Sequence, residues 1–428
     1  MKKKAKIFYG WWIVLVTNII CMTGFGTWLY AFPAFFGPMT AEFGWSRAQT
    51  SGAASFRSIE GGIAGPIVGW LVDKFGSRNV VLGSGIISGF GFVLMTQVNS
   101  LISFYLIYGL VVSVGMSGMT YIPAFTVIAK WFKKRLSLAF SLLAIGAALG
   151  GTFWSPAAAW LIANYGWRSA FFVIGIAIWA IVIPLSFVIV ETPEKKGLRM
   201  DNDPEDDGKD ADSDQPKPLV QPDYTARQAL ASRSFWLLSI AWFFQSMAFN
   251  VVFVHGVVAM TDMGIEYLKA AALIGAITSV SFFGRMILGL LGDYIEKRYL
   301  LFFAYCLISG GIFALANAHS MGMVYLFVGL YGFGYGGTVP VMASLRADYF
   351  GRTALGKIQG FMSPVAMLAG AFGPVVTGYI FDQTASYTYA FSVIGTLAFI
   401  GAWVLLFTKP KILPGTLLEQ TADSGARL

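Results

Sequence analysis

The chain has 428 residues, of which 56% are hydrophobic and only 12% are charged. An ordinary soluble domain carries about 25% charged residues, so this composition, with a mean hydropathy of +0.67, excludes a soluble globular fold. The net charge of +8 indicates no nucleic-acid partner, because the basic residues lie between apolar runs, where they report membrane topology.

Apolar runs about as long as a membrane-crossing helix, roughly 18 residues or more, recur along the chain at near-regular spacing. Backbone polar groups have no partner in lipid, so we expect every run to be a helix. The pattern predicts an all-α integral membrane protein with twelve transmembrane helices. The runs are residues 11–37, 50–72, 79–98, 101–129, 136–163, 168–190, 235–260, 270–292, 299–317, 321–345, 358–381 and 387–408.

Basic residues are distributed unevenly between the two sets of loops. The first run follows MKKKAK and is too long for a signal peptide, and the opposite side holds only Arg47, Arg168 and Lys269. This asymmetry predicts that both termini lie in the cytoplasm and that the protein resides in the cell (inner) membrane. The basic residues expected on the cytoplasmic side are Lys2, Lys3, Lys4, Lys6, Lys74, Arg78, Lys130, Lys133, Lys134, Arg135, Lys297, Arg298, Arg346, Arg352 and Lys357.

Residues 191–230 break the apolar pattern. The stretch 201–214 alone carries eight acidic residues, which is too polar to bury a core, so we expect a disordered cytoplasmic linker. The acidic residues fall near the spacing of a calcium-binding loop that starts at Asp203, but the third position is Glu205 and the twelfth is Asp214. We therefore expect no metal site.

The sequence repeats itself on either side of this linker. GWLVDKFGSR (69–78) aligns with GLLGDYIEKR (289–298), and YGWRSAFFVIG (165–175) aligns with ASYTYAFSVIG (385–395), with one constant offset. Two distant matches at the same offset indicate duplicated halves of six spans each, with the same orientation in the membrane. The predicted units are a six-helix bundle over 1–190, the linker over 191–230, a second six-helix bundle over 231–410 and a cytoplasmic tail over 411–428.

The GWLVDKFGSR stretch, its weaker copy and the two six-span halves resemble the major facilitator superfamily over essentially the whole chain outside the linker and tails. YGWWIV (9–14) and LYAFP (29–33) resemble first-helix signatures of the monocarboxylate transporter family. WFKKRLSLAFSLLAIGAALG (131–150) is similar to that family's signature at the fifth helix, and bacterial oxalate–formate exchangers share much of it. The resemblance implies a transporter whose substrate sits near the midplane between the halves.

Arg285 lies in the apolar stretch AITSVSFFGRMILGLLG, eight residues before Asp293 at the expected cytoplasmic edge of the helix. At about 1.5 Å per residue it is about 12 Å inside a hydrocarbon core of about 30 Å. A charge at this depth usually faces a cavity on a substrate or ion path, and a guanidinium suits a carboxylate. A structural ion pair is the alternative, but Ser281 and Gly289, four residues away, are not acidic. The resemblance implies the same role, since family members hold the substrate carboxylate with an arginine of the eighth helix.

The family pattern and this chain differ around the expected site. Mammalian-type members carry an aspartate where this chain has Ser281 and a lysine where it has Ala34, and residues 360–374 lack the lysine of oxalate carriers. One cavity arginine without a second cation predicts a substrate with a single carboxylate. The further candidates for substrate contact are Tyr121 and Tyr335, for which packing is the alternative, Ser281, and Leu143 and Leu149 as apolar walls.

Two pairs of residues are candidates for proton coupling or gating. Arg57 and Glu60 lie three residues apart on one helix face, where we expect a structural ion pair or an outer gate, with direct substrate contact as the alternative. Glu60 is also the first candidate for the proton carrier. His255 and Asp262 are seven residues apart and share a face near the outer end of the seventh helix. An interfacial histidine and a loop acid are the alternative interpretation of this second pair.

The repeated motif itself predicts a latch. Asp73 and Arg78 bracket a short cytoplasmic turn, and Asp293 and Arg298 repeat the pattern. A carboxylate at this place would face the N-terminus of a neighbouring helix, and the guanidinium would bond it. We interpret the two pairs as latches that hold the halves closed on the inside. A plain charged turn, the alternative, does not predict the duplicate.

Glycines with helical spacing predict close helix packing. Residues 61, 65 and 69 form one such series, and residues 146 and 150 form another. Small residues at this spacing let two helix backbones approach closely in a membrane.

Together these features predict a secondary active transporter, a proton-coupled symporter of a small monocarboxylate such as lactate or pyruvate. The alternative is a carboxylate exchanger of the oxalate–formate type, which a second cavity cation such as Arg57 would favour. A membrane enzyme or sensor is a third possibility, but the sequence holds no catalytic constellation, and Cys21 and Cys306 both lie in apolar runs. We expect a monomer whose partners are the anion, a proton and the bilayer, without a cofactor.

Overall fold

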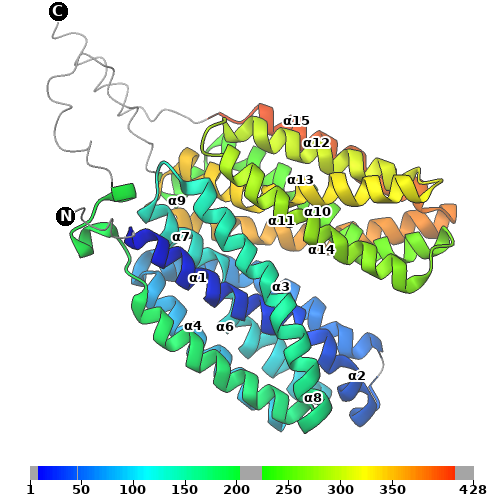
Figure 1. The fold of residues 1–428 in the computed structure, drawn as a ribbon, viewed down its shortest axis with the longest axis horizontal. Helices are drawn as coiled ribbons and strands as arrows, with labels where there is room; N and C mark the ends of the chain where they lie inside the picture. Colours follow the sequence, from blue (N-terminus) through cyan, green and yellow to red (C-terminus); the bar gives the residue numbers. More distant parts are fainter. Residues whose placement is uncertain (1–7, 46, 203–223, 410–428) are drawn as a thin grey trace, which may run out of the picture.

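The computed structural model describes residues 8–45, 47–202 and 224–409, which form helices and no β-strand. They build two helical bundles that lie side by side (Figure 1). The first bundle contains α1 (Tyr9–Phe25), η1 (Gly26–Tyr30), α2 (Phe32–Phe43), α3 (Arg47–Phe75), α4 (Ser77–Leu94), η2 (Met95–Gln97), α5 (Leu101–Phe104), η3 (Tyr105–Val112), α6 (Ser113–Ser117), α7 (Tyr121–Trp131) and α8 (Leu136–Val188). The second contains α10 (Arg233–Asp262), α11 (Tyr267–Leu291), α12 (Lys297–Ala316), α13 (Met321–Phe350), α14 (Leu355–Thr384) and α15 (Tyr387–Leu406).

Ten segments of the described chain are long and apolar enough to cross a membrane. One of them, Leu136–Ser186, has 51 residues, and at about 1.5 Å per residue it is more than twice as long as a bilayer core is thick. It bends at Gly166, whose φ of +79° is a backbone conformation that glycine adopts without strain. The less apolar α3 adds a further helix of 29 residues. The count of twelve spans and the side on which the termini lie stay predictions.

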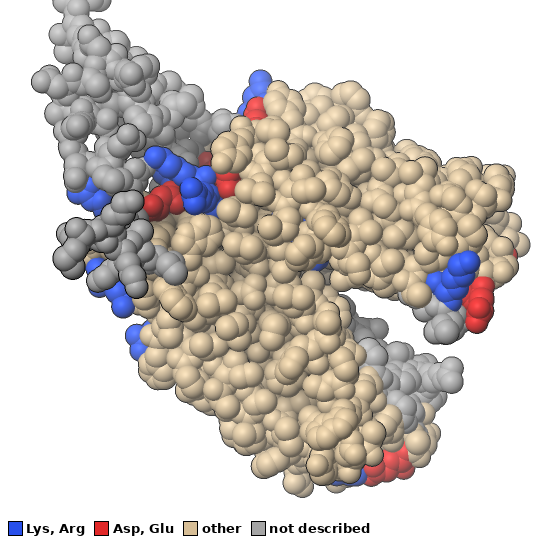
Figure 2. All heavy atoms as spheres, in the orientation of Figure 1, with Lys and Arg blue, Asp and Glu red and all other residues tan. Residues whose placement is uncertain are grey.

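The outer surface between the two ends of the molecule is apolar. On the face seen in Figure 2, the Lys, Arg, Asp and Glu side chains gather at the two ends, and the surface between them is largely uncharged. Large apolar side chains are exposed along this middle zone, for example Ile63 at 61%, Phe153 at 58% and Phe283 at 60%. An apolar surface of this kind is stable against lipid and costly against water.

One end of the molecule collects the ends of both bundles. The Tyr9 hydroxyl at the start of α1 donates to the Val188 carbonyl at the end of α8 at 2.8 Å. The Ser234 hydroxyl near the start of α10 donates to the Lys409 carbonyl, just after α15, at 2.5 Å. We call this end the terminal face. The bundles touch near it and part toward the opposite end of the molecule (Figure 2).

Glycines bring the two bundles into contact near the terminal face. Gly65 and Gly69 of α3 lie against Gly356 and Gly360 of α14, and a methyl group on Gly69 would overlap the Gly356 carbonyl. This confirms the packing role predicted for residues 65 and 69. The same role is confirmed for residues 146 and 150, which lie against α1 and η1. The prediction is wrong for Gly61, because no atom lies within 4 Å of the methyl position there.

The predicted linker has structure at both of its ends. The short helices are η4 (Pro193–Lys196), η5 (Met200–Asn202) and α9 (Ala226–Leu230). The Asp201 carboxylate accepts hydrogen bonds from the backbone N–H groups of Lys133 and Lys134 at 2.8 and 2.6 Å, and Tyr224 is buried. The calcium-like spacing from residue 203 and the predicted tail from residue 411 lie outside the described residues.

The close contact between α3 and α14 predicts that Gly69→Ala destabilises the protein. The new methyl group has no space against the Gly356 carbonyl, and overpacking costs about 1–3 kcal/mol. We expect a lower midpoint in thermal unfolding of the purified protein.

The matched control is Gly83→Ala on α4, where no atom lies within 4 Å of the new methyl group. Alanine is about 0.5–1 kcal/mol better than glycine inside a helix, so the midpoint should rise or stay. Equal midpoints for the two variants would contradict the close packing.

Candidate functional site

Arg285 lies inside the second bundle, near the first. It belongs to α11 and its side chain is only 7% exposed. Its guanidinium carbon lies 5.9 Å from the ring centre of Tyr335 on α13. It forms no ion pair with any residue that the structure describes, and its buried Nη1 has no hydrogen-bond acceptor there. A guanidinium stays protonated, so its buried charge calls for an anionic partner.

Three tyrosines, two from the first bundle and one from the second, lie in the neighbourhood of this guanidinium. The hydroxyls of Tyr30, Tyr121 and Tyr335 all lie within electrostatic range of Arg285. Tyr30 ends the π-helical turn η1 of the first bundle, Tyr121 begins α7 of the same bundle, and Tyr335 belongs to the second. Arg285 is therefore the centre of a site that neither bundle forms alone.

A cavity of about 400 Å³ adjoins this site between the bundles. It is lined from α3, α7, α10, α13 and α14, and Tyr121, which interacts with Arg285, is part of its wall. Gly61, the glycine with open space at its methyl position, lines it as well. Ligand pockets usually have volumes of about 300–1,000 Å³, so the cavity has room for a small molecule.

The other predicted substrate contacts lie elsewhere. Leu143 is fully buried in the core of the first bundle, and Leu149 is 46% exposed. The buried Ser281 hydroxyl donates to the Thr278 carbonyl of its own helix at 2.7 Å. The Ser281 carbonyl lies against Gly336 of α13. The described lining of the 400 Å³ cavity includes none of these three residues, and neither Arg285 nor Tyr335 is part of it.

Arg346 corrects the sequence analysis, which counts it among the basic residues of the cytoplasmic side. It is only 7% exposed and lines the cavity, four residues before the end of α13. The described lining of the cavity thus contains one arginine, and it is Arg346 in place of the expected Arg285. The hydropathy pattern places the end of the span at residue 345, whereas the helix continues to Phe350 and turns Arg346 inward.

The predicted coupling residues give a mixed result. The two ring nitrogens of His255 contact the Tyr387 hydroxyl at 3.2 Å and the Pro374 carbonyl at 3.0 Å, so this ring joins α10 to α14 and α15. Asp262 is exposed at the end of α10. Arg57 and Glu60 lie on α3, but their side chains are outside the described residues.

No metal centre is present in the part of the chain that the structure describes. It contains no group of three His, Cys, Asp or Glu side chains that could hold a metal ion. The two cysteines are both free, with Cys21 buried and Cys306 partly buried.

Each bundle caps a helix of the other at the terminal face. The Asp73 carboxylate of the first bundle accepts a hydrogen bond from the backbone N–H of Lys357, in the first turn of α14, at 3.1 Å. The Asp293 carboxylate of the second bundle accepts from the backbone N–H groups of Ser137 and Leu138, in the first turn of α8, at 2.8 and 3.1 Å. A carboxylate is favourable at a helix N-terminus. The expected approach of these carboxylates to neighbouring helices is thus present, and in equivalent places.

The two motif arginines do not bond these carboxylates. The Arg78 guanidinium stacks over the Phe187 ring at the end of α8, with 5.0 Å to the ring centre. Arg298 pairs with Glu296 at 2.8 Å and donates to the Thr408 carbonyl after α15 at 3.0 Å. Each arginine therefore fastens the last helix of its own bundle, and the expected arginine–aspartate contact is not formed.

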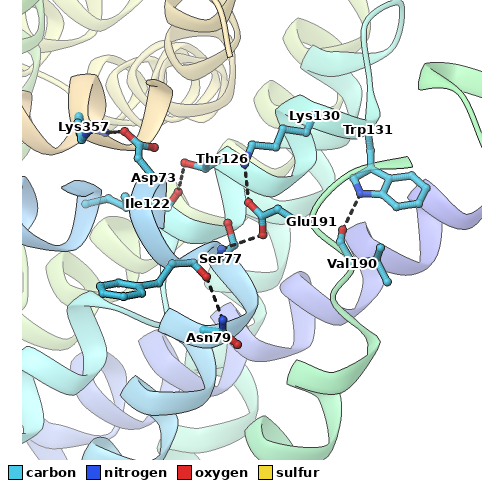
Figure 3. A network of polar contacts seen from close by, with 11 residues as sticks. Asp73, Ser77, Asn79, Ile122, Thr126, Lys130, Trp131, Val190, Glu191 and Lys357 are labelled. Carbon is cyan, nitrogen blue, oxygen red and sulfur yellow. Dashed lines mark hydrogen bonds and ion pairs between the residues drawn. The ribbon is translucent and has the colours of Figure 1, made fainter. Parts of the chain in front are cut away.

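A polar network beside Asp73 strengthens the terminal face of the first bundle (Figure 3). The carboxylate of Glu191, just after α8, forms an ion pair with the Lys130 ammonium of α7 at 2.5 Å. Its second oxygen accepts the backbone N–H of Ser77, the first residue of α4, at 2.9 Å. The Trp131 indole donates to the Val190 carbonyl at 2.8 Å. This network joins three helices within one bundle, in contrast to the caps, which join the two bundles.

Comparison with known proteins gives concordant results. The sequence profile described as Major Facilitator Superfamily matches residues 14–362 and 289–424. The chain is 27% identical to cattle (Bos taurus) Monocarboxylate transporter 13, over 97% of this chain and 95% of that protein. It is 25% identical to human (Homo sapiens) Monocarboxylate transporter 2, over 98% and 89%. The crystal structure of the human organic anion transporter MFSD10 has the same fold, with a TM-score of 0.71 and 14% identity over 92% of this chain and 99% of that one.

The reciprocal caps predict that Asp293→Ala opens the terminal face. Loss of a helix N-cap costs about 0.5–2 kcal/mol. Because this cap exists only in the closed form, its loss should enrich the open form by about 2- to 30-fold. Spin labels at the exposed positions Asn79 and Tyr299, one per bundle, should show a larger long-distance population by double electron–electron resonance. Glu296→Ala, three residues away and bonded to Arg298, is the control. Unchanged distances in Asp293→Ala would show that this cap does not hold the terminal face closed.

Acidification should favour the closed form of the terminal face. Burial raises the pKa of the Asp293 carboxyl in the closed form, whereas a hydrated aspartate in an open form has an ordinary pKa of about 3.9. The form with the higher pKa binds the proton more tightly, so a fall in pH through this range favours the closed form. The same labels should report shorter distances at acid pH, and Asp293→Asn should reduce the response. Longer distances at acid pH would have the wrong sign.

Proposed function

Because the chain belongs to the major facilitator superfamily, we propose that it transports a small monocarboxylate together with a proton. The observation that carries this proposal is Arg285, a buried guanidinium that lies within electrostatic range of tyrosines from both bundles and forms no ion pair with a described carboxylate. The names of the two monocarboxylate transporter relatives, which align over nearly the whole chain, agree with it.

The chemistry of recognition follows from the groups present. The guanidinium would receive the substrate carboxylate in a forked pair of hydrogen bonds. The hydroxyls of Tyr121 and Tyr335 would hold the remaining polar atoms of a hydroxy or keto acid. In a buried site such contacts are stronger than in water, and a short acid with one carboxylate and one further oxygen would match these groups. Lactate and pyruvate are of this size and charge.

Alternating access would use the reciprocal caps. In the present conformation the bundles are joined at the terminal face by Asp73 and Asp293, and they part on the opposite side (Figure 2). We assign the terminal face to the cytoplasm by the positive-inside rule, with twelve membrane crossings in a monomer of the cell membrane. Release of both caps would then let the halves rock and open the site inward.

A proton travelling with the anion would make the translocated load neutral. Glu60 is the first candidate to carry it, and Asp262 and His255 are further candidates. The two nitrogen contacts of His255 favour a structural role for that residue over titration. The carrier of the proton is therefore assigned to Glu60 in this proposal.

A second candidate function is the exchange of one carboxylate anion for another. The observation that favours it is Arg346, a cation on the cavity wall in addition to Arg285, which lies outside the described lining. An exchanger needs no proton, because the anion that leaves balances the charge of the one that enters.

Arg285→Lys should lose most transport while the protein stays folded. Lysine keeps the charge but not the forked geometry, and charge-assisted hydrogen bonds are worth about 1.5–3 kcal/mol, or about 10- to 150-fold in kcat/KM. The measurement is uptake of labelled lactate into proteoliposomes. Arg227→Lys, at an exposed arginine of α9, is the control. Wild-type uptake by Arg285→Lys would remove this residue from the site.

The driving force separates the two candidate functions. Symport predicts that an inward proton gradient drives lactate accumulation into empty proteoliposomes, and that Glu60→Gln makes uptake less dependent on pH. If uptake instead requires an anion loaded inside and ignores the proton gradient, exchange replaces symport. An unchanged pH profile in Glu60→Gln would reject this residue as the carrier.

A further inference from the structure

Arg346 is the least satisfied charge on the wall of the cavity. Its side chain is 7% exposed, and its Nε and Nη2 atoms are buried without a hydrogen-bond acceptor. The described residues offer it no ion pair. Its guanidinium carbon lies 4.8 Å from the ring centre of Trp242, also on the cavity wall. An aromatic face attracts a cation but provides no hydrogen-bond acceptor, so the N–H groups of Arg346 stay unmatched.

Neighbouring polar groups are also donors. The Gln359 amide nitrogen, on the same wall, is buried with no partner. The Tyr305 hydroxyl is buried without a partner as well and lies within electrostatic range of Arg346. The described lining of the cavity contains no Asp or Glu. Among the described residues, this wall of the cavity therefore offers a cation and buried N–H donors but no anionic acceptor.

This group of donors is distinct from the Arg285 site. Arg346 lies eleven residues after Tyr335 on α13, about 16 Å farther along the helix axis toward the terminal face. Gln359 marks the same end of the cavity on α14, where the lining residues extend from Gln359 to Gly370. The two arginines therefore belong to different levels along the bundle axis.

We propose that Arg346 and Gln359 form a second binding site for the carboxylate of the transported anion, between Arg285 and the terminal face. This inference rests on the proposed function. An anion that leaves Arg285 has the Arg346 site as its next station toward the terminal face, and an anion that enters from that face meets Arg346 first. The site therefore sets the affinity of one face of the transporter and not of the other.

The test compares the two faces. Labelled lactate uptake is measured in intact cells and in inside-out membrane vesicles from the same cells, which present opposite faces to the label. The face of each preparation is fixed by reacting Arg227→Cys, at the terminal face, with an impermeant maleimide. Arg346→Gln should raise KM about tenfold at the terminal face, with KM at the opposite face unchanged within about twofold. Arg346→Lys, which keeps the charge, should restore most of the affinity.

Folding is checked on the purified variants. If Arg346 binds an anion, lactate should raise the unfolding midpoint of the wild type more than that of Arg346→Gln, because a ligand stabilises the form that binds it. Arg227→Gln is the matched control for loss of one arginine and should behave as the wild type in both assays.

Three outcomes would overturn the proposal. If Arg346→Gln leaves KM unchanged at both faces, Arg346 is a structural cation. If KM rises equally at both faces, Arg346 belongs to a single site with Arg285. If the wild type transports no carboxylate, the proposed function fails and this inference falls with it, whereas the first two outcomes leave the proposed function intact.

Discussion

A permanent positive charge buried between two helical bundles is the constraint on which the rest of this structure depends. Arg285 has no carboxylate beside it within the described chain, and an unpaired buried ion costs several kcal/mol. The Tyr335 ring, whose centre lies 5.9 Å from the guanidinium carbon, attracts the cation but does not neutralise its charge. An anion bound at the junction of the two halves would offset this cost.

The same junction also holds the contacts that close one end of the molecule. The carboxylates of Asp73 and Asp293 close one end of the molecule by capping a helix of the other bundle. Glycines bring α3 and α14 close enough for the Asp73 cap to form. Because each cap needs a partner across the junction, both are broken together when the halves rotate. Closure at one end and access at the other are thus properties of one interface.

Much of this arrangement was predictable from local sequence patterns. The constant offset between the halves predicts equivalent places for Asp73 and Asp293, and the apolar context of Arg285 predicts its depth. These inferences depend on distance along a helix, which is fixed by 1.5 Å per residue. The approach of residues 65 and 69 to a neighbouring helix follows from their spacing in the same way.

The failures concern side-chain direction, which tertiary packing decides. In the hydropathy pattern Arg346 is simply the first charge after an apolar run. The structure shows that α13 extends past this residue and that Arg346 turns toward the cavity. Arg78 and Arg298 contact the ends of their own bundles and not the carboxylates of the motif. Tyr30 reaches Arg285 from a π-helical turn, a register shift common at functional sites that the LYAFP pattern does not specify.

The most direct measurement is equilibrium binding of radiolabelled lactate to the purified protein, compared between the wild type and Arg285→Gln. We expect saturable binding to the wild type and a Kd at least about tenfold higher in the variant, since a charge-assisted contact is lost. An unchanged Kd in Arg285→Gln, with saturable binding retained, would contradict the assignment of this guanidinium as the receptor of the carboxylate.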